Sequence, residues 1–513
     1  MQHKWIAILD FGSQYTQLIA RRIREQQVYS EILRFDTSAA TLRERMPAGI
    51  VLSGGPNSVF EKGAPLSDPA IFELGIPVLG ICYGMQLTAK TLGGTVKPGT
   101  HREYGHTQVE VLCGNKLFDG VPSDFNVWMS HGDQVEVMPA GFTTSARSLS
   151  CPNAAMRNEA KNFYALQFHP EVVHTQHGQQ ILHNFLFSIC GCTGDWKLSS
   201  WVDETVEKLK KQVGSEHVVL GLSGGVDSSV VAVLLHKAIG DRLHCIFVDN
   251  GLLRYGEDKQ VETMFHAKLG MDLHVIDAKE RFYAALKGVE EPEKKRKIIG
   301  REFIEVFAEQ AREFKDCKFL GQGTIYPDVI ESVSPLKGPS QTIKSHHNVG
   351  GLPPDLKFEL VEPLRELFKD EVRAVGRVLG MDAELLDRQP FPGPGMGVRI
   401  LGEVNAERVA LLQQADLRVQ EEMRKLPNYK SIWQSFAVLL PIKSVGVMGD
   451  QRTYENVCAL RAVDSIDAMT ADWTRVPYDT LARISNRIIN EVRGINRVVF
   501  DISSKPPATI EWE

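Results

Sequence analysis

The amino-acid sequence predicts an α/β protein with two open, mostly parallel α/β sheet domains in tandem, followed by a small α+β domain. Three observations predict this class. Short, continuously apolar segments alternate with amphipathic segments in two parts of the chain, which is typical of parallel strands covered by helices on both faces. This pattern breaks near residues 193–200 and then restarts. A second break, rich in proline and glycine, spans residues 388–397 and cannot continue a helix or a central strand.

The elements follow in order along the chain. In the first part, "WIAILDFG", "GIVLSGGP" and "IPVLGICYG" are predicted strands, and "TQLIARRIREQQ" and "MQLTAKTLGG" are predicted helices. In the second part, the long helix "SWVDETVEKLKKQV" leads into the strands "HVVLGLSGG", "LHCIFVDNG", "DLHVIDA" and "KFLGQGT", with "SSVVAVLLHKAIG" as a helix. Beyond the second break we expect a helix around residues 405–425 and strands at "FAVLLPI", "SVGVMG" and "RVVFDIS". The predicted domains are therefore residues 1–195, 196–388 and 389–513.

Composition predicts an ordinary soluble globular protein, because 43% of the 513 residues are apolar and 24% are charged. The net charge of −6 argues neither for nor against a nucleic-acid or membrane partner. No apolar run approaches the ~20 residues of a membrane helix, and the apolar stretch near the first residue is too short for a signal peptide. We expect no membrane or nucleic-acid partner, although composition does not decide this, and small-molecule substrates follow from the family resemblance alone.

The eight cysteines are scattered without a disulfide framework, which favours reduced thiols and a cytoplasmic location. Cys190 and Cys192 form a C-x-C that lacks a second metal-spaced pair, so we expect no zinc. The basic run at residues 294–297 is expected to be the solvated start of a helix rather than a polyanion site.

The segment "LGICYGMQ" places Cys82 between Gly80 and Gly84, directly after an apolar strand. G-x-C-x-G has the spacing of the nucleophile elbow G-x-S-x-G, in which a strand turns sharply into a helix. The helix N-terminus favours the thiolate and leaves the Tyr83 N–H free to bind an oxyanion. The alternative is a structural cysteine, which behaves as a small buried hydrophobe.

The segment "LQFHPEV" supplies a base and an orienting carboxylate, His169 and Glu171, which a thiol nucleophile needs. Alternate residues of a strand share a face, so we expect both side chains to point toward one site. A core histidine beside a surface glutamate is the alternative.

Together, these segments resemble the class I, triad-type glutamine amidotransferases. The resemblance implies that Cys82 attacks the side-chain amide of glutamine, His169 transfers the proton and Glu171 orients the imidazole. "LSGGP" matches the glycine-rich oxyanion strand of that family, which implies the Gly55 N–H as the second donor beside Tyr83. "WMSHGD", at residues 128–133, resembles the family's glutamine-holding segment.

The segment "LGLSGGVDSSVVAVLL" begins as a strand, turns, and becomes a helix. Glycine N–H groups, serine hydroxyls and a helix N-terminus suit phosphate oxygens. The loop lacks the G-K-[ST] ending of a Walker A motif and resembles the loop of the ATP pyrophosphatases, which leave AMP on their substrate. The residues expected to bind ATP are Ser223, Gly224, Gly225, Val226, Asp227, Ser228 and Ser229.

Two further ATP-binding residues are expected outside this loop. Asp249 ends the next strand, at the carboxyl edge where open α/β sheets bind ligands. The resemblance of "ELFKDEVR" to the same family implies that Lys369 meets pyrophosphate, whereas a turn aspartate and a solvated helix lysine are the alternatives. Mg²⁺ is expected with ATP, to neutralise phosphate charge, but no residue is assigned as its ligand.

A glutamine-hydrolysing half and an adenylating half on one chain predict an ATP-dependent ligase that uses the released ammonia and forms AMP. The acceptor follows only from a wider resemblance. The segments "KRKIIGREFIEVF", "GQGTIYPDVIES", "KSHHNVGGLP", "RQPFPGPGMGVR", "LPIKSVGVMGDQRTY" and "SKPPATIEWE" resemble the glutamine-hydrolysing GMP synthase family. Its order of amidotransferase, ATP pyrophosphatase and C-terminal dimerisation domain matches the whole chain.

That resemblance implies amination of xanthosine 5′-monophosphate (XMP) to GMP through an adenyl-XMP intermediate, in a homodimer. The residues it implies as XMP contacts are Arg296, Gln434, Asp450, Lys505 and Glu511. One alternative is another ammonia-fed adenylating ligase, such as a NAD synthetase or a tRNA-modifying enzyme, which the C-terminal segments disfavour. The other is a non-catalytic nucleotide sensor, which the intact Cys82, His169, Glu171 and nucleotide loop disfavour.

Overall fold

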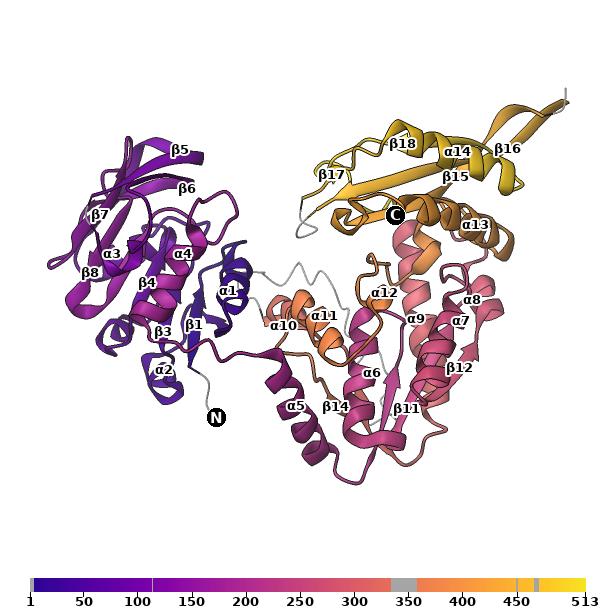
Figure 1. Ribbon diagram of the computed structural model, residues 1–513, viewed down its shortest axis with the longest axis horizontal. Coiled ribbons are helices and arrows are strands. Elements are labelled where there is room, and N and C mark those ends of the chain that lie inside the picture. Colours follow the sequence, from indigo (N-terminus) through magenta and orange to yellow (C-terminus); the bar gives the residue numbers. More distant parts are fainter. Residues whose placement is uncertain (1–3, 113, 334–357, 449–450, 466–469) are drawn as a thin grey trace. The chain divides into compact units, whose positions relative to one another are not determined.

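The computed structural model describes residues 4–112, 114–333, 358–448, 451–465 and 470–513, and Figure 1 labels many of its helices and strands. The chain folds into two compact units. The first comprises Met1–Trp201 with Pro327–Thr342, and the second comprises Val202–Tyr326 with Ile343–Glu513. Helices α5 (Leu198–Val213) and α10 (Tyr326–Val333) each include residues of both units. The predicted α/β class is confirmed.

The first unit is built on a nine-stranded sheet of order β2-β1-β3-β4-β9-β8-β7-β5-β6. Its parallel strands are β1 (Trp5–Asp10), β2 (Tyr29–Arg34), β3 (Gly49–Leu52), β4 (Val78–Ile81) and β9 (Phe163–Leu166). Its antiparallel strands are β5 (Thr95–Val111), β6 (Asp124–Val137), β7 (Thr143–Ser148) and β8 (Ala155–Asn158). Its helical segments are α1 (Thr16–Glu25), α2 (Ala39–Arg45), η1 (Pro69–Glu73), α3 (Tyr83–Thr91), η2 (Lys116–Phe118), η3 (Glu159–Lys161), α4 (Gly178–His183) and η4 (Asn184–Ile189).

The two glycines of G-x-C-x-G let helix α3 lie directly against the sheet backbone. A Cβ at Gly84 would lie 2.3 Å from the carbonyl oxygen of Leu52 in β3, and one at Gly80 would lie 2.7 Å from the carbonyl of Gly84. Any side chain at either position would push α3 away from β3 and β4. Glycine is therefore required at both positions for α3 to pack against the sheet at the turn that carries Cys82.

The second unit contains two sheets. The parallel sheet has the order β12-β11-β10-β13-β14, with β10 (His217–Gly221), β11 (Leu243–Asp249), β12 (Asp272–Asp277), β13 (Cys317–Gly321) and β14 (Glu359–Val361). The other sheet pairs β15 (Gln434–Met448) with β16 (Gln451–Asp464), which also pairs with β17 (Asp472–Trp473) and β18 (Ile495–Asp501). The helical segments are α6 (Val226–Ile239), η5 (Gly240–Arg242), α7 (Glu257–Glu262), η6 (Thr263–Lys268), α8 (Lys279–Leu286), α9 (Pro292–Ala311), α11 (Lys369–Val378), α12 (Ala383–Leu386), η8 (Gly395–Val398), α13 (Ala406–Met423), η9 (Tyr429–Ser431) and α14 (Tyr478–Glu491).

One hydrophobic core runs through the second unit, from Val219 and Ile246 in the parallel sheet to Leu439 and Ile488 beside the other sheet. The proline- and glycine-rich break is an ordered segment of this core. Met396 is fully buried, and its N–H donates to the carbonyl of Leu252 at 2.7 Å. The positions predicted as separate strands at "FAVLLPI" and "SVGVMG" form the single strand β15, whose pairing with β16 is irregular between Leu439 and Lys443.

The basic run at residues 294–297 does start a helix, α9, as expected, but it is not fully solvated. Lys295 is completely buried, and its ammonium pairs with Glu513 at 2.5 Å and donates to the carbonyl of Ile400 at 2.7 Å. Among the described residues, the helices are all too short or too polar to span a bilayer.

Candidate active sites

Cys82 occupies a strained turn between β4 and α3. Its backbone has φ 53° and ψ −105°, in the left-handed half of conformational space, and it is the residue that precedes the first turn of α3. Its N–H donates to the carbonyl of Leu166 in the neighbouring strand β9 at 2.7 Å, which fixes the turn to the sheet. A non-glycine residue held in such a conformation costs about 1–3 kcal/mol and is typical of functional positions.

His169 and Glu171 lie beside this cysteine, as predicted, although the local reason was wrong. Both follow the end of β9 and lie in a turn, so strand alternation does not bring them together. His169 Nδ1 lies 2.7 Å from Glu171 Oε1, and both side chains are buried. Thr175 Oγ1 donates to the His169 carbonyl at 2.6 Å, which holds the turn that presents the imidazole.

The surroundings of His169 favour its charged form. Burial lowers the pKa of His169, but the Glu171 carboxylate and the hydrogen bonds with Cys82 and Glu171 outweigh burial and hold this pKa well above its ordinary value. An imidazolium beside a cysteine is the partner that stabilises a thiolate nucleophile. The structure thus brings the three predicted catalytic residues into one hydrogen-bonded set.

The two predicted oxyanion donors are also adjacent. Gly55 follows β3 and is packed so closely that a Cβ on it would lie 3.2 Å from Tyr83 Cγ and 2.9 Å from the Phe11 carbonyl. Tyr83 is the first residue of α3, so its N–H has no acceptor within the helix. Its hydroxyl donates to the Pro65 carbonyl at 2.7 Å, and burial, with help from Glu61, raises the pKa of Tyr83 to about 12.

The segment predicted to hold glutamine forms part of β6 and borders the nucleophile. The Cys82 thiol lies 3.6 Å from the carbonyl oxygen of Ser130. Gln86 in α3 donates to the carbonyl of Asp133 at 2.9 Å, and Gln167 lies 3.7 Å from Cys82 Sγ. Backbone and amide groups of β6, α3 and the end of β9 therefore surround the thiol.

The predicted nucleotide loop joins β10 to α6 and is held by its own serines. Gly224 has φ 72°, and Gly225 precedes the first turn of α6. Ser223 Oγ lies 3.0 Å from Ser228 Oγ and accepts from the Gly225 N–H at 3.3 Å, and Ser229 Oγ donates to the Gly225 carbonyl at 2.7 Å. The loop thus presents a helix N-terminus to an anion.

Two carboxylates at this sheet edge pair with lysines. Asp227 in α6 contacts Lys369 at the start of α11 through Oδ2, and its buried Oδ1 has no hydrogen-bond partner among the described residues. Asp249 ends β11 and pairs with Lys279 at 2.9 Å, and this hydrogen bond raises the pKa of Lys279. The structure therefore brings the predicted Asp227 and Lys369 together, and it adds Lys279, which the sequence analysis missed.

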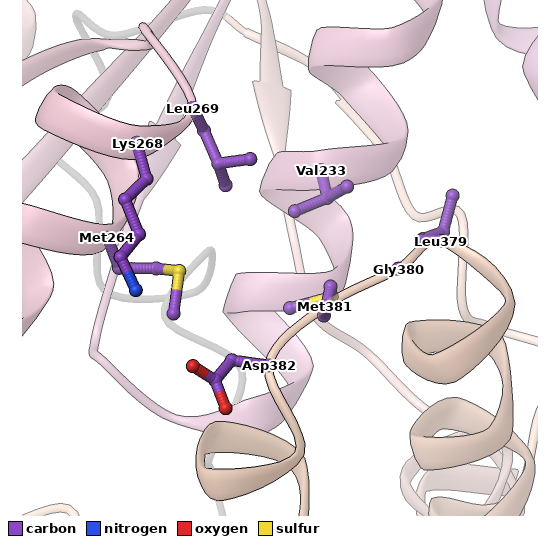
Figure 2. Close-up of a pocket in the computed structure, with 8 residues that line it drawn as sticks. All are labelled: Val233, Met264, Lys268, Leu269, Leu379, Gly380, Met381 and Asp382. Atoms are coloured by element: carbon purple, nitrogen blue, oxygen red, sulfur yellow. The ribbon is translucent and has the colours of Figure 1, made fainter.

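A separate pocket opens beside α6, η6 and the segment after α11 (Figure 2). Figure 2 shows Lys268 on η6 and Asp382 on the segment that follows α11. Its lining residues are Val233, Met264, Lys268, Leu269, Leu379, Gly380, Met381 and Asp382. None of them belongs to the predicted ATP or XMP residues, so this pocket is not the expected nucleotide site.

Two of the residues implied as XMP contacts lie together. Gln434, the first residue of β15, donates to Glu511 Oε1 at 2.7 Å. Arg399, which the sequence analysis missed, is fully buried and pairs with both oxygens of Glu511 at 2.9 and 3.1 Å. Glu511 is thus held rigidly by a bidentate guanidinium.

The other residues implied as XMP contacts are not part of this pair. Arg296 in α9 donates to the carbonyl of Glu513. Lys505 forms a backbone bridge with Ala471, its N–H donating to the Ala471 carbonyl at 2.7 Å. Asp450 lies outside the described residues.

Comparison with known proteins finds family matches in three segments of the chain. Residues 7–189 match glutamine amidotransferase class-I, residues 197–304 match NAD synthase, and residues 421–512 match the GMP synthase C terminal domain. A protein of Maridesulfovibrio salexigens named GMP synthase (glutamine-hydrolyzing) is 58% identical over 516 residues and covers 100% of both chains. A protein of the same name from Brachyspira hyodysenteriae is 57% identical over 508 residues and covers 99% of each.

The chain belongs to the glutamine-hydrolysing GMP synthase family.

Membership of the GMP synthase family decides between the alternatives that the sequence left open. The match to NAD synthase covers only the part that carries the nucleotide loop, whereas residues 421–512 match a domain described for GMP synthases. The chain is therefore an ATP-dependent amidotransferase ligase, and neither a NAD synthetase nor a nucleotide sensor.

The sequence analysis did not predict a buried pair, Glu103 and His131, in the amidotransferase unit of this GMP synthase family member. Glu103 in β5 lies opposite His131 in β6, and their side chains meet at 2.9 Å. Ser148 and Ser150 donate to the other oxygen of Glu103 at 2.8 and 2.5 Å. Burial opposes the charge of Glu103, but these hydrogen bonds hold its pKa below the ordinary value.

This pair stiffens the strand beside the nucleophile. The other nitrogen of His131 lies 3.0 Å from the carbonyl oxygen of Asp133, so the imidazole is fixed at both ends. We predict that Glu103→Gln lowers the free energy of unfolding by about 1–3 kcal/mol, because the buried donors lose a charged acceptor. We also predict that it raises the KM for glutamine about tenfold and leaves kcat nearly unchanged. This corresponds to a loss of ~1.4 kcal/mol of glutamine-binding free energy, because β6 is held less firmly.

The measurement is thermal unfolding together with glutamine- and ammonia-dependent kinetics. Glu110→Gln is the matched control, because Glu110 lies on the same strand in an exposed ion pair with Arg147, which contributes about 0–1 kcal/mol. If the KM for ammonia rises as much as the KM for glutamine, Glu103→Gln acts on the fold as a whole and not on the glutamine site.

Proposed function

We propose that this protein converts XMP to GMP with ATP and glutamine, releasing AMP, pyrophosphate and glutamate, and that the residues described above perform the two half-reactions. The observation that carries the proposal is the buried set of Cys82, His169 and Glu171 at a strained elbow. This set can release ammonia from an amide, and the same chain carries a phosphate-binding loop that can activate an acceptor.

In the first half-reaction, the Cys82 thiolate attacks the side-chain amide carbon of glutamine. The negative charge that develops on the amide oxygen is stabilised by the N–H groups of Gly55 and Tyr83, and one such donor contributes about 10²–10³ in rate. The His169 imidazolium gives its proton to the departing nitrogen, so ammonia leaves and a thioester remains. His169 then takes a proton from water, which hydrolyses the thioester to glutamate and frees the thiol.

In the second half-reaction, ATP lies on the loop at Ser223–Ser229, whose N–H and hydroxyl groups bind its phosphates. The XMP oxygen at C2 attacks the α-phosphate, and pyrophosphate leaves toward Lys369 and Lys279. Ammonia then replaces the oxygen at C2, and AMP departs. Asp249 holds Lys279 in position at 2.9 Å.

Mg²⁺ fits the same edge of the sheet. Asp227 Oδ1 is buried and has no hydrogen-bond partner among the described residues, and carboxylate oxygens are the ligands that Mg²⁺ prefers in proteins. Asp227 would hold the ion, which would neutralise phosphate charge when bound.

XMP is assigned to Arg296, Gln434, Asp450, Lys505 and Glu511. We predict that Gln434→Ala raises the KM for XMP about 10- to 100-fold, which corresponds to ~1.4–2.8 kcal/mol for the loss of a buried donor. Gln420→Ala is the matched control. Gln420 in α13 donates to the backbone carbonyl of Ser435 at 2.6 Å, as Gln434 donates to that of Pro390 at 3.0 Å. Steady-state kinetics with ammonium as nitrogen donor separate this effect from glutamine hydrolysis. An unchanged KM for XMP would remove Gln434 from the site.

A homodimer is supported by exposed apolar side chains on the paired strands β15 and β16. Ile442, Val445 and Val447 are 56%, 52% and 73% exposed, and Tyr454, opposite Val445, is 60% exposed. Such a cluster on a surface is typical of an interface. We predict that Val447→Glu converts a dimer into a monomer in light scattering at micromolar concentration, whereas Val378→Glu in α11 leaves it unchanged. A dimer that persists with Val447→Glu would place the interface elsewhere.

We propose domain boundaries at 1–195, 196–388 and 389–513, which the matched segments 7–189, 197–304 and 421–512 support. The second and third of these domains share one hydrophobic core. Seven cysteines are free within the described part of the chain, which supports a reducing, cytoplasmic location.

The decisive experiment is turnover with glutamine, ATP and Mg²⁺, with XMP, nicotinate adenine dinucleotide or tRNA in parallel. With XMP we expect GMP, AMP and pyrophosphate in equal amounts. With nicotinate adenine dinucleotide or tRNA we expect no AMP. AMP formation with another acceptor, or none with XMP, would refute the proposed reaction.

A further inference from the structure

Three histidines and an aspartate gather at the amino edge of the parallel sheet, the edge opposite the nucleotide loop. His217 starts β10, His244 is the second residue of β11, and Asp272 and His274 lie at the start of β12. His244 pairs in register with Asp272, so neighbouring strands bring these side chains together. All four belong to the second compact unit.

The distances place three possible ligand atoms around one point. His244 Nδ1 lies 2.5 Å from Asp272 Oδ2, and His274 Nε2 lies 3.0 Å from Asp272 Oδ1. One ligand atom from each of the three residues lies within 4.8 Å of the other two. His274 Nε2 faces Asp272 without a hydrogen bond of good geometry among the described residues, and a cation between the two side chains would satisfy both atoms.

His217 completes the arrangement as a positioning residue. Its Nδ1 lies 2.8 Å from His244 Nε2, so His244 can donate its remaining N–H to His217 while Nδ1 coordinates a metal. Metal-bound histidines almost always have such a partner, which fixes the tautomer and the ring orientation. Phe314 also lies 4.8 Å, centroid to centroid, from both His244 and His274, and it restricts the motion of both rings.

We propose that His244, Asp272 and His274 bind one divalent transition-metal ion of the zinc type, with water completing the shell. Two imidazoles and one carboxylate suit Zn²⁺ rather than Mg²⁺, which prefers oxygen ligands alone. The side chains of His244, Asp272 and His274 are 17%, 42% and 34% exposed, so the cluster borders solvent, from which water would complete the shell. The bound ion joins β11 to β12 and stabilises the unit that carries the nucleotide loop.

The other cluster of metal-type side chains differs in a way that sharpens this assignment. Glu103, His131 and Cys151 also lie within ligand distance of one another, but all three are buried. Both oxygens of Glu103 and both nitrogens of His131 already have partners. Burial, with the charge of Glu103, also raises the pKa of Cys151 to about 12, which opposes the thiolate that a metal needs. Both nitrogens of His244 also have partners, so the two clusters differ in solvent exposure rather than in hydrogen bonding, and only the histidine cluster borders solvent.

The sequence could not reveal this site, and the expectation of no zinc rested on cysteine spacing alone. His217, His244 and His274 are separated by 27 and 30 positions, and only the parallel register of β10, β11 and β12 unites them.

The test is titration of the tag-free full-length chain with Zn²⁺ alone, in a Cys82→Ala background so that the catalytic thiol does not compete. We expect one equivalent to bind tightly and to raise the melting temperature. Co²⁺ should bind at the same stoichiometry and give visible bands without the near-ultraviolet band of a thiolate ligand. Asp272→Asn and His274→Gln should each abolish this equivalent, and His217→Ala should weaken it about 10- to 100-fold.

The control is His266→Gln, which removes an exposed histidine of η6 outside the cluster and should leave binding unchanged. Ammonia-dependent activity with ATP and Mg²⁺, and without added zinc, verifies that each variant is folded. No zinc equivalent in the parent chain, a thiolate band with Co²⁺, or an equivalent that survives both Asp272→Asn and His274→Gln would overturn the assignment.

Discussion

Cys82→Ala should abolish glutamine-dependent GMP synthesis, by about 10⁴-fold or more, while synthesis from ammonium salts remains within about twofold. The thiol forms the only covalent bond to glutamine in the proposed mechanism, and the adenylating residues lie in a different compact unit. Parallel assays of GMP formation with glutamine and with ammonium chloride measure the two routes.

Cys151→Ala is the matched control, because Cys151 is also buried in the amidotransferase unit but hydrogen-bonds through its N–H to Ser148 rather than facing His169. It should keep both routes if the chain remains folded. Loss of the ammonium route in a folded Cys82→Ala chain would show that the two half-reactions are not separable.

Asp227→Asn should reduce both routes by at least ~100-fold, because each requires adenylation of XMP. The substitution keeps the shape of the side chain but removes the negative charge that Lys369 contacts and replaces one carboxylate oxygen with an amide NH2, which is a poorer partner for Mg²⁺. Pyrophosphate release with XMP, ATP and ammonium measures the effect. The Mg²⁺ concentration needed for half-maximal rate should also rise.

Asp241→Asn provides the comparison, since Asp241 lies in η5, at the other end of α6 from the loop. It should leave both routes unchanged. Full ammonium-dependent activity of Asp227→Asn would show that the loop does not bind ATP in the proposed way.

Local features of the site were predictable from the sequence because they depend on residues close together in the chain. The strand-to-helix turn at Cys82 follows from two glycines that remove side chains from a tight contact. The contact of His169 with Glu171 was also expected, although it arises from a turn rather than a strand. The loop at Ser223–Ser229 folds as its glycines and serines suggest.

Contacts between distant residues were not predictable, because they depend on register and packing. Glu103 meets His131 only because the pairing of β5 with β6 shifts between Pro98 and Glu103. Arg399 meets Glu511 across 112 positions of sequence. Such pairs leave no spacing pattern, so a single sequence identified Glu511 only through family resemblance and did not identify Arg399.

The backbone of Cys82 has a consequence for protein engineering. A glycine there would adopt φ 53° freely and would release about 1–3 kcal/mol of conformational energy. Directed evolution that rewards heat resistance alone would therefore select against Cys82, the residue proposed to release ammonia. An activity screen is needed at every round to retain cysteine at position 82, where the positive φ is unfavourable for any residue but glycine.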